Sequence, residues 1–195
     1  MKKSSFFAMI SRMKYINRWG LMRNTRPENL SEHSLDTAVI AHALALIGNR
    51  RLGQSYNPER AALLCIYHDT SEIITGDLPT PVKYHSDEIR YAYRDVERLA
   101  QNSLLAMLPE DLRPEYREIM IYGGPEDGKL KPLVKAADKI SAVIKCIEEK
   151  KSGNTEFETA EQTLRGTICD MSLAEADIFM EEFLPAYLLT LDEQK

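Results

Sequence analysis

The chain has 195 residues, of which 44% are hydrophobic and 28% are charged, and its net charge is −5 at pH 7. This length suffices for one domain with a full hydrophobic core. An acidic chain is a poor match for a nucleic-acid polymer, because proteins bind such polymers largely by neutralising phosphates with basic side chains. We therefore expect a single domain over residues 1–195 that binds no nucleic-acid polymer, while a local basic site for one small phosphate stays compatible with the composition.

The three cysteines are Cys65, Cys146 and Cys169, an odd number without a CxxC pair. Such spacing is typical of reduced thiols rather than of a disulfide framework. No stretch approaches the roughly twenty consecutive apolar residues that a membrane-spanning helix needs. The sequence thus predicts a cytoplasmic protein without a membrane partner.

Apolar residues at helical spacing predict an amphipathic helix over about residues 5–17. The following loop, residues 17–27, carries three arginines and the only tryptophan, Trp19. Asn29, with Glu32 three residues later, predicts a capped helix start. This helix is expected to run over residues 31–48 and to lie at the centre of the fold. The residues expected on its buried face include Leu35, Val39 and Leu46.

Asn57 and Pro58 predict the start of the next helix, which is expected to carry residues 67–72 and to stop at Gly76. Pro79 and Pro81 then predict an ordered turn rather than a helix over residues 77–85. Further helices are predicted over residues 89–107, 109–121, 133–150, 155–169 and 172–191, with a surface loop at residues 123–128. No stretch alternates as a strand does, so the predicted fold class is all-α.

A polar cluster follows the apolar helical segment 61–66, in the run YHDTSE at residues 67–72. Side chains three and four positions apart on a helix share a face, so Glu72 is expected beside His68 and Asp69. Burying a carboxylate beside a histidine is costly unless a partner such as a divalent metal compensates it. A His-Asp dipeptide alone is a weak signal, because most such dipeptides are surface hydrogen-bonded pairs.

His33, near the start of one predicted helix, and Asp138, within an otherwise apolar helix, join His68 and Asp69 as candidate metal ligands. Nitrogen and oxygen donors without sulfur suit a borderline or hard divalent metal such as Mn, Co, Zn, Fe or Mg. Two imidazoles and two carboxylates leave coordination positions open for water and a substrate oxygen. Open positions are typical of a catalytic rather than a structural site.

Several of the candidates also have a purely structural interpretation. Asp138 can be a buried ion-pair partner of Lys135 or Lys139, and Trp19 can be a core anchor. His42 lies on the apolar face of its predicted helix, where a hydrogen-bonded buried histidine is expected rather than a ligand.

The order of His33, His68-Asp69 and Asp138 resembles the H…HD…D pattern of the HD-domain metal-dependent phosphohydrolases. Four longer runs are similar to the YfbR-like group of bacterial 5′-deoxynucleotidases in this superfamily: INRW at 16–19, ENLSEHS at 28–34, YHDTSE at 67–72 and TGDLPTPVK at 75–83. The similarity covers essentially the whole chain, and the RW pair together with GDLPTP is far more specific than the H…HD…D pattern. Gly20 stands where the group has proline, a change that loosens the loop but removes no functional group.

The resemblance implies an all-α, single-domain HD-domain fold with one divalent metal ion per subunit, held by His33, His68, Asp69 and Asp138. Co, Mn and Zn are the expected ions. The implied reaction is hydrolysis of deoxyribonucleoside 5′-monophosphates to the deoxynucleoside and phosphate, without action on ribonucleotides, in a homodimer. The metal in such a site lowers the pKa of a bound water and polarises a phosphate oxygen.

The same resemblance suggests roles for the other residues. Arg18 is expected to bind the phosphate and to stabilise its charge, and Glu72 to move a proton to the 5′-oxygen or from the water. Trp19 and the turn at residues 77–80 are expected to enclose the sugar, with Trp19 against C2′ as the candidate for rejecting a 2′-hydroxyl. The expected substrate-binding residues are Arg18, Trp19, Asp69, Asp77, Leu78, Pro79, Thr80 and Asp138.

Two other functions stay open from the sequence. One is an HD phosphohydrolase acting on another nucleotide, a dNTP or a guanosine alarmone, and the other is a non-catalytic nucleotide-sensing module. The scarcity of free basic groups for extra phosphates argues against the first. The complete ligand set together with Glu72 argues against the second. Base preference and the dimer interface are not readable from the sequence.

Overall fold

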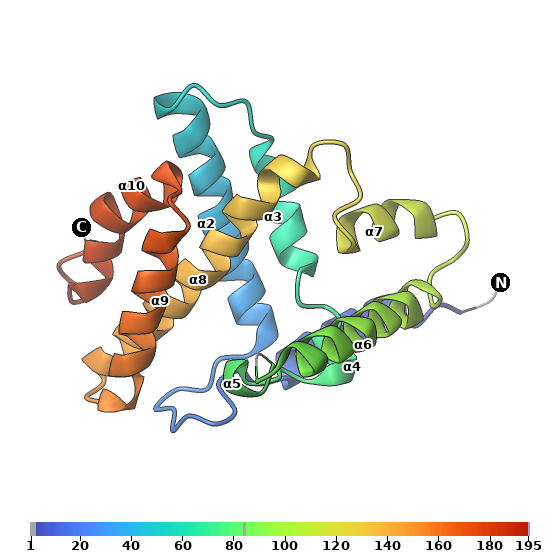
Figure 1. Cartoon of the computed structure of the whole chain (residues 1–195), viewed down its shortest axis with the longest axis horizontal. Helices are drawn as coiled ribbons and strands as arrows, with labels where there is room; N and C mark the ends of the chain where they lie inside the picture. Colours follow the sequence, from blue (N-terminus) through green and yellow to red (C-terminus); the bar gives the residue numbers. More distant parts are fainter. Residues whose placement is uncertain (1–2, 84, 195) are drawn as a thin grey trace.

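Helices form nearly all the regular structure of the protein (Figure 1). Its computed structural model describes residues 3–83 and 85–194, and within these ranges the chain contains no strand and one isolated antiparallel bridge between Asn17 and Asn29. This confirms the predicted all-α class. The α-helices are α1 Phe6–Ile10, α2 Leu30–Arg51, α3 Pro58–Tyr67, α4 Glu72–Thr75, α5 Thr80–Lys83, α6 Asp87–Leu105, α7 Arg113–Met120, α8 Asp127–Lys151, α9 Glu158–Asp170 and α10 Ala174–Glu182. The 3-10 helices are η1 Ser11–Tyr15, η2 Thr155–Phe157 and η3 Leu184–Leu188.

Helix α2 lies at the centre, where it packs against α3, α8, α10 and η1 (Figure 1). Its predicted capping box is confirmed, because Asn29 Oδ1 accepts from the backbone N–H of Glu32 at 3.1 Å and Glu32 Oε2 accepts from the Asn29 N–H at 3.2 Å. The predicted buried face is wrong in part, since Leu35, Val39 and Leu46 are exposed. The residues of α2 that pack in the main core with α3 and α8 are Ala38, Ile40, Ala41, Leu44, Ala45 and Ile47.

The helix predicted to carry residues 67–72 breaks at its end. Helix α3 ends at Tyr67, residues 68–71 form a turn, and α4 begins at Glu72. The Thr70 hydroxyl donates to the Tyr67 carbonyl at 2.8 Å, a local bond that competes with the continuing helix. His68 and Asp69 therefore lie in a turn between two helices and not within a helix. Gly76 ends α4 as predicted, with a φ of 73° that favours glycine.

The two prolines of residues 77–85 do not exclude a helix. Pro81 is the second residue of α5, Thr80–Lys83, and proline is tolerated in a first helical turn because its missing N–H has no partner there. The prediction of an ordered turn instead of a helix was therefore wrong for Thr80–Lys83, while Tyr84 lies outside the described residues.

Helix α8 begins earlier than predicted and contains Pro132 in its interior. Its first residue, Asp127, is buried and accepts two hydrogen bonds of 2.8 Å from Arg60 and one of 2.8 Å from the Gly124 N–H. This buried pair fixes the helix start inside the stretch that was predicted to be surface loop.

The main core lies between α2, α3, α8 and α10, and a smaller one surrounds Phe6 beside α6. A third cluster contains Met13 from η1, Leu30 from α2 and Ile73 from α4. This third cluster ties together the elements that border the candidate site. Among the described residues, no helix combines the length and the apolar character needed to cross a membrane.

Candidate metal centre and active site

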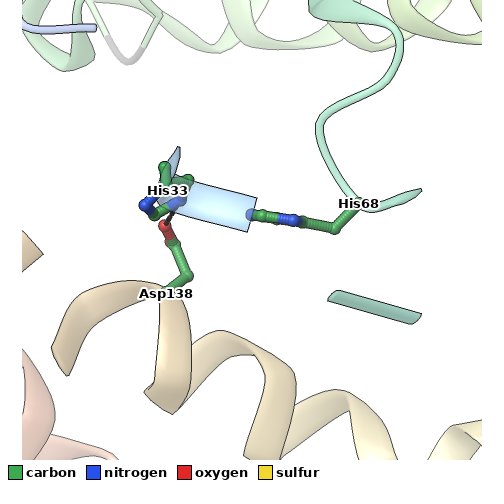
Figure 2. A group of neighbouring side chains, drawn as sticks. All are labelled: His33, His68 and Asp138. Atoms are coloured by element: carbon green, nitrogen blue, oxygen red, sulfur yellow. Dashed lines mark ion pairs between the residues drawn. The ribbon is translucent and has the colours of Figure 1, made fainter. Parts of the chain in front are cut away.

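Three elements bring the predicted ligands together (Figure 2). His33 lies in the first turns of α2, His68 in the turn after α3, and Asp138 in the middle of α8. Each offers one donor atom, and these atoms all lie within 4.8 Å of one another. The closest approach is 3.1 Å, between His33 Nε2 and Asp138 Oδ1.

The fourth predicted ligand, Asp69, lies beside the two histidines of this group but is not one of the residues whose donor atoms all lie within 4.8 Å of one another. Its Oδ2 lies 3.1 Å from His68 Nε2 and 3.7 Å from His33 Nε2. The Nε2 atoms of both histidines therefore face the two carboxylates of Asp69 and Asp138.

Outer hydrogen bonds fix the orientation of both imidazoles. His68 Nδ1–H donates to the Cys65 carbonyl at 2.6 Å, and His33 Nδ1 lies 3.1 Å from the Ser141 hydroxyl. A donor on Nδ1 leaves Nε2 as the lone-pair nitrogen, the arrangement that metal-ligating histidines show. His68 Nε2 is buried and has no hydrogen-bond partner of acceptable geometry. A buried polar atom of this kind needs a partner, and the donor set around it fits a borderline divalent metal.

The charges of the cluster also suit a cation. Burial lowers the pKa of His33 to about 4. Burial opposes the charge on Asp69, but the adjacent His68 lowers the pKa of Asp69 to about 2. Burial likewise opposes protonation of His68, yet the neighbouring Asp69 raises its pKa to about 9. At neutral pH the cluster thus holds ionised carboxylates and a neutral His33, and a metal ion there would displace the proton of His68.

Lys139 lies 3.1 Å from Asp138 Oδ2, so the ion-pair interpretation of Asp138 holds for one oxygen while the other oxygen faces His33. His42 is half-buried and does not belong to the cluster.

Arg18 and Trp19 lie on the loop between η1 and α2. The Arg18 side chain is 13% exposed, and its Nη1 is buried without a hydrogen-bond partner. Trp19 is half-buried, with its ring centroid 5.2 Å from that of Phe157. Its indole Nε1–H donates to Glu28 Oε2 at 2.8 Å, and its backbone N–H donates to Asp77 Oδ2 at 3.2 Å. Trp19 thus contacts both the loop and the turn at residues 77–80, and is not a fully buried core anchor.

Glu72 is buried at the start of α4, and its Oε2 has no hydrogen-bond partner. Burial, together with the carboxylates of Asp69 and Asp77, raises the pKa of Glu72 to about 9. This environment favours the protonated acid, the form that can donate a proton.

The turn at residues 77–80 borders the same region. Leu78 and Pro79 are half-buried, and Thr80 is exposed at the start of α5. Of the side chains in this turn, that of Asp77 is the one hydrogen-bonded to the Arg18–Trp19 loop. Asp77 Oδ2 is thus used as an acceptor for the Trp19 backbone N–H.

The Arg18–Trp19 loop is anchored to α8 by a buried acid that the sequence interpretation missed. The Glu149 carboxylate accepts from the backbone N–H and hydroxyl of Thr25, the N–H of Arg26, the Asn154 amide and the Lys145 ammonium. Lys145 also donates to the Arg26 carbonyl at 2.5 Å. The available signal was an oppositely charged pair four residues apart on the buried side of an apolar helix.

Glu28, Ser141 and the Cys65 carbonyl were also missed as parts of the site. Glu28 belongs to the run at residues 28–34, but nothing in the run distinguishes it from its neighbours. The carbonyl of Cys65 is three residues before His68, a spacing that could have revealed the contact.

Comparison with known proteins agrees with this geometry. The family model described as 5′-deoxynucleotidase YfbR-like matches residues 5–187. A 5′-deoxynucleotidase of Erwinia tasmaniensis is 50% identical over 190 residues, covering 97% of this chain and 96% of the relative. The 5′-deoxynucleotidase YfbR of Escherichia coli is 50% identical over 193 residues, covering 99% of this chain and 96% of the relative.

Solved structures show the same fold. An HD-domain phosphohydrolase from Listeria innocua superposes with a TM-score of 0.80 at 24% identity, covering 96% of this chain and 90% of that one. The HD phosphohydrolase of cyanophage S-2L, whose structure contains dA and one catalytic Zn²⁺ ion, superposes with a TM-score of 0.64 at 18% identity, covering 95% of this chain and 98% of that one. The chain therefore has the HD-domain fold and belongs to the YfbR-like 5′-deoxynucleotidase family.

Proposed function

We propose that this protein is a metal-dependent 5′-deoxynucleotidase that hydrolyses deoxyribonucleoside 5′-monophosphates to the deoxynucleoside and phosphate. The observation that carries the proposal is the group of donor atoms from His33, His68 and Asp138 within 4.8 Å of one another, in which the buried His68 Nε2 makes no hydrogen bond. Membership of a family whose relatives carry the name 5′-deoxynucleotidase supplies the substrate class.

His33, His68, Asp69 and Asp138 are the residues that would hold one divalent ion per subunit. When bound, such an ion supplies Lewis acidity, which favours deprotonation of water near neutral pH and polarises a phosphate oxygen. Nitrogen and carboxylate donors accept Co, Mn and Zn, and these are the proposed ions.

Arg18 binds the phosphate in this proposal. Its buried, unpartnered Nη1 is available for a charge-assisted hydrogen bond to a phosphate oxygen. Asp69 and Asp138 contact the substrate from the other side of the cluster. Glu72 donates the proton that the 5′-oxygen needs as it leaves, since burial and the neighbouring carboxylates favour its protonated form.

The sugar lies between Trp19 and the turn that contains Asp77, Leu78, Pro79 and Thr80. Selectivity against ribonucleotides comes from the indole packed against C2′, which leaves no room for a 2′-hydroxyl. A Trp19→Ala enzyme should therefore hydrolyse ribonucleotides, and an alanine variant that still ignored them would refute the steric explanation.

The test is phosphate release from paired deoxyribo- and ribonucleoside 5′-monophosphates. Metal-stripped protein is resupplied with Mn, Co, Zn or Mg, and His33→Ala is compared with His42→Ala on the same helix. Release from the deoxy compounds only, lost in His33→Ala and kept in His42→Ala, is the expected result. No release from any of them by folded, metal-loaded protein would refute the proposal, and turnover of a dNTP or guanosine alarmone would replace it.

We also propose that the enzyme is a cytoplasmic homodimer. Exposed apolar side chains on α2, among them Val39 and Leu35 at 62% each, favour association between copies. The free thiols of Cys65, Cys146 and Cys169 are compatible with a reducing compartment. Light scattering should give twice the chain mass of 22.2 kDa, and a mass of one chain would refute the dimer.

A further inference from the structure

Glu28 lies where three groups of the candidate site meet. Its Oε2 accepts from Trp19 Nε1–H at 2.8 Å and lies 3.8 Å from Arg18 Nε, while its Oε1 lies 4.0 Å from His33 Nδ1. The Glu28 side chain is 11% exposed, so these interactions are largely shielded from water. One carboxylate thus adjoins the proposed phosphate-binding, sugar-binding and metal-binding residues.

The Glu28 carboxylate forms an ion pair with one edge of the Arg18 guanidinium, at 3.8 Å from Nε. It lies beside the Nε edge, and Nη1 remains buried without a partner. Because a guanidinium is planar and rigid, holding its Nε edge also sets the direction of its two Nη atoms. The charge of Glu28 at the Nε edge therefore favours an orientation in which Nη1 of Arg18 is the available donor.

The conformation of Trp19 also depends on this contact. Trp19 has a φ of 61°, in the left-handed region that bulky residues rarely adopt. Such a conformation persists only where the surroundings hold it. Trp19 donates two hydrogen bonds, one from the indole to Glu28 and one from the backbone N–H to Asp77. Its carbonyl accepts from the Met22 N–H at 2.8 Å and from the Asn24 amide at 3.4 Å, so Glu28 is the partner that holds the indole ring while the turn holds the backbone.

Glu28 itself is held firmly at the start of α2. Its backbone carbonyl accepts from the Arg18 N–H at 2.9 Å. A second backbone hydrogen bond joins the same two segments, from the Leu30 N–H to the Ile16 carbonyl at 3.0 Å. The residue after Glu28 is the helix-capping Asn29. The carboxylate is thus part of the rigid base of the loop and not of its exposed tip.

We propose that Glu28 is a positioning residue for this reaction, holding the Trp19 indole at the sugar and orienting Arg18 toward the phosphate. The proposal rests on the proposed function, which supplies the roles of Arg18 and Trp19. Glu28 acts through these two residues, so its two effects can be separated by choosing the substitution.

Glu28→Gln keeps an oxygen for the indole but removes the negative charge beside Arg18. We expect kcat/KM for a deoxynucleoside monophosphate to fall about tenfold, with the deoxy-to-ribo ratio nearly unchanged. Glu28→Ala removes both contacts, and we expect a fall of about 100-fold together with a clear loss of sugar discrimination. Glu148→Gln, an exposed acid on α8, is the matched control and should behave as the parent enzyme.

Trp19 is the only tryptophan of the chain, so intrinsic emission reports this contact without any turnover. In Glu28→Ala the emission maximum should shift to the red, and the indole should become more accessible to the quencher acrylamide. In Glu28→Gln both the emission maximum and the quenching should stay near those of the parent. If the parent enzyme releases no phosphate, the proposed function fails, and the emission comparison still decides whether Glu28 holds Trp19.

Parent-like kinetics and emission in both variants would overturn the proposal. Equal losses of kcat/KM in both, with unchanged sugar discrimination and a matching loss of thermal stability, would also overturn it, because they would assign Glu28 to folding alone.

Discussion

The buried Glu149, which anchors the Arg18–Trp19 loop to α8, allows a quantitative test of stability. Glu149 is 1% exposed and accepts five hydrogen bonds, three of them from the loop residues Thr25 and Arg26. Glu149→Ala would leave the Lys145 ammonium, which is 5% exposed, without its carboxylate. Removing one partner of a buried ion pair costs about 3–5 kcal/mol. That is a large share of the roughly 5–15 kcal/mol that stabilises a domain.

The measurement is the free energy of unfolding in urea, at pH 7, for the parent and the variants. Glu149→Gln keeps one acceptor oxygen but turns an NH₂ toward other donors, so we expect the free energy of unfolding to fall by about 1–3 kcal/mol. Adding Lys145→Met to Glu149→Ala should recover part of the loss, since the unpaired charge is gone. The exposed neighbour Glu148→Gln should change stability by less than about 0.5 kcal/mol. A cost below about 1 kcal/mol for Glu149→Ala would refute this account of the anchor.

The same anchor predicts a pH dependence. Burial alone would raise the pKa of Glu149, but the hydrogen bonds from Lys145, Thr25 and Asn154 hold it far below its ordinary value. As the pH falls through the unfolded-state pKa of about 4.3, the unfolded chain binds the proton first. The contribution of Glu149 is therefore complete above about pH 5 and decreases as the pH falls toward the folded-state pKa. The difference in unfolding free energy between parent and Glu149→Gln should stay constant above about pH 5 and shrink as the pH falls further toward the folded-state pKa. A difference that stays constant below about pH 5 would contradict the reasoning.

Three further results are expected. Removing divalent metal should lower the melting temperature by about 5–10 °C, the effect expected for a ligand held at about 100 times its Kd. The change should be reversible, and it should be smaller in the Asp138→Asn variant. An unchanged melting curve would argue against a metal centre. Glu72→Gln should lower kcat by about 10²–10⁴-fold while metal still raises the melting temperature, and a parent-like kcat would remove Glu72 from proton transfer. Gly48→Ala should cost about 1–3 kcal/mol, because its Cβ would lie 2.7 Å from the Tyr56 ring. Gly166→Ala, with open space around it, should be neutral or slightly stabilising, and equal effects at both glycines would refute the close-approach argument.

Short-range signals predicted the parts of the fold that depend on local chemistry. The Asn29 capping box and the break at Gly76 each involve residues at most four positions apart, and both are confirmed. The prediction of where α8 starts was wrong because the start depends on Arg60, which lies 67 positions from its partner Asp127. No local pattern encodes a contact of that range.

The candidate site, too, could be predicted from the sequence only in part. His33, His68 and Asp138 were identified from residue types, order and a family resemblance, and the structure brings their donor atoms together. Which atoms face the site could not be read from the sequence, since this depends on Ser141 and on the Cys65 carbonyl. Glu28 was overlooked because an acid before a helix cap is ordinary, and only the folded loop brings it against Trp19.

The distribution of the proposed metal ligands along the chain also bears on how the protein would acquire its metal. His33 and the hydroxyl that orients it, Ser141, are separated by 108 positions, so the donor set exists only after α2, α3 and α8 have docked. An ion arriving earlier would find isolated side chains with little affinity for it. Metal should therefore enter a chain that has already folded, slowing its unfolding rather than speeding its folding. Folding and metal loading would then be separate steps, and the activity of the folded chain would follow the supply of free metal.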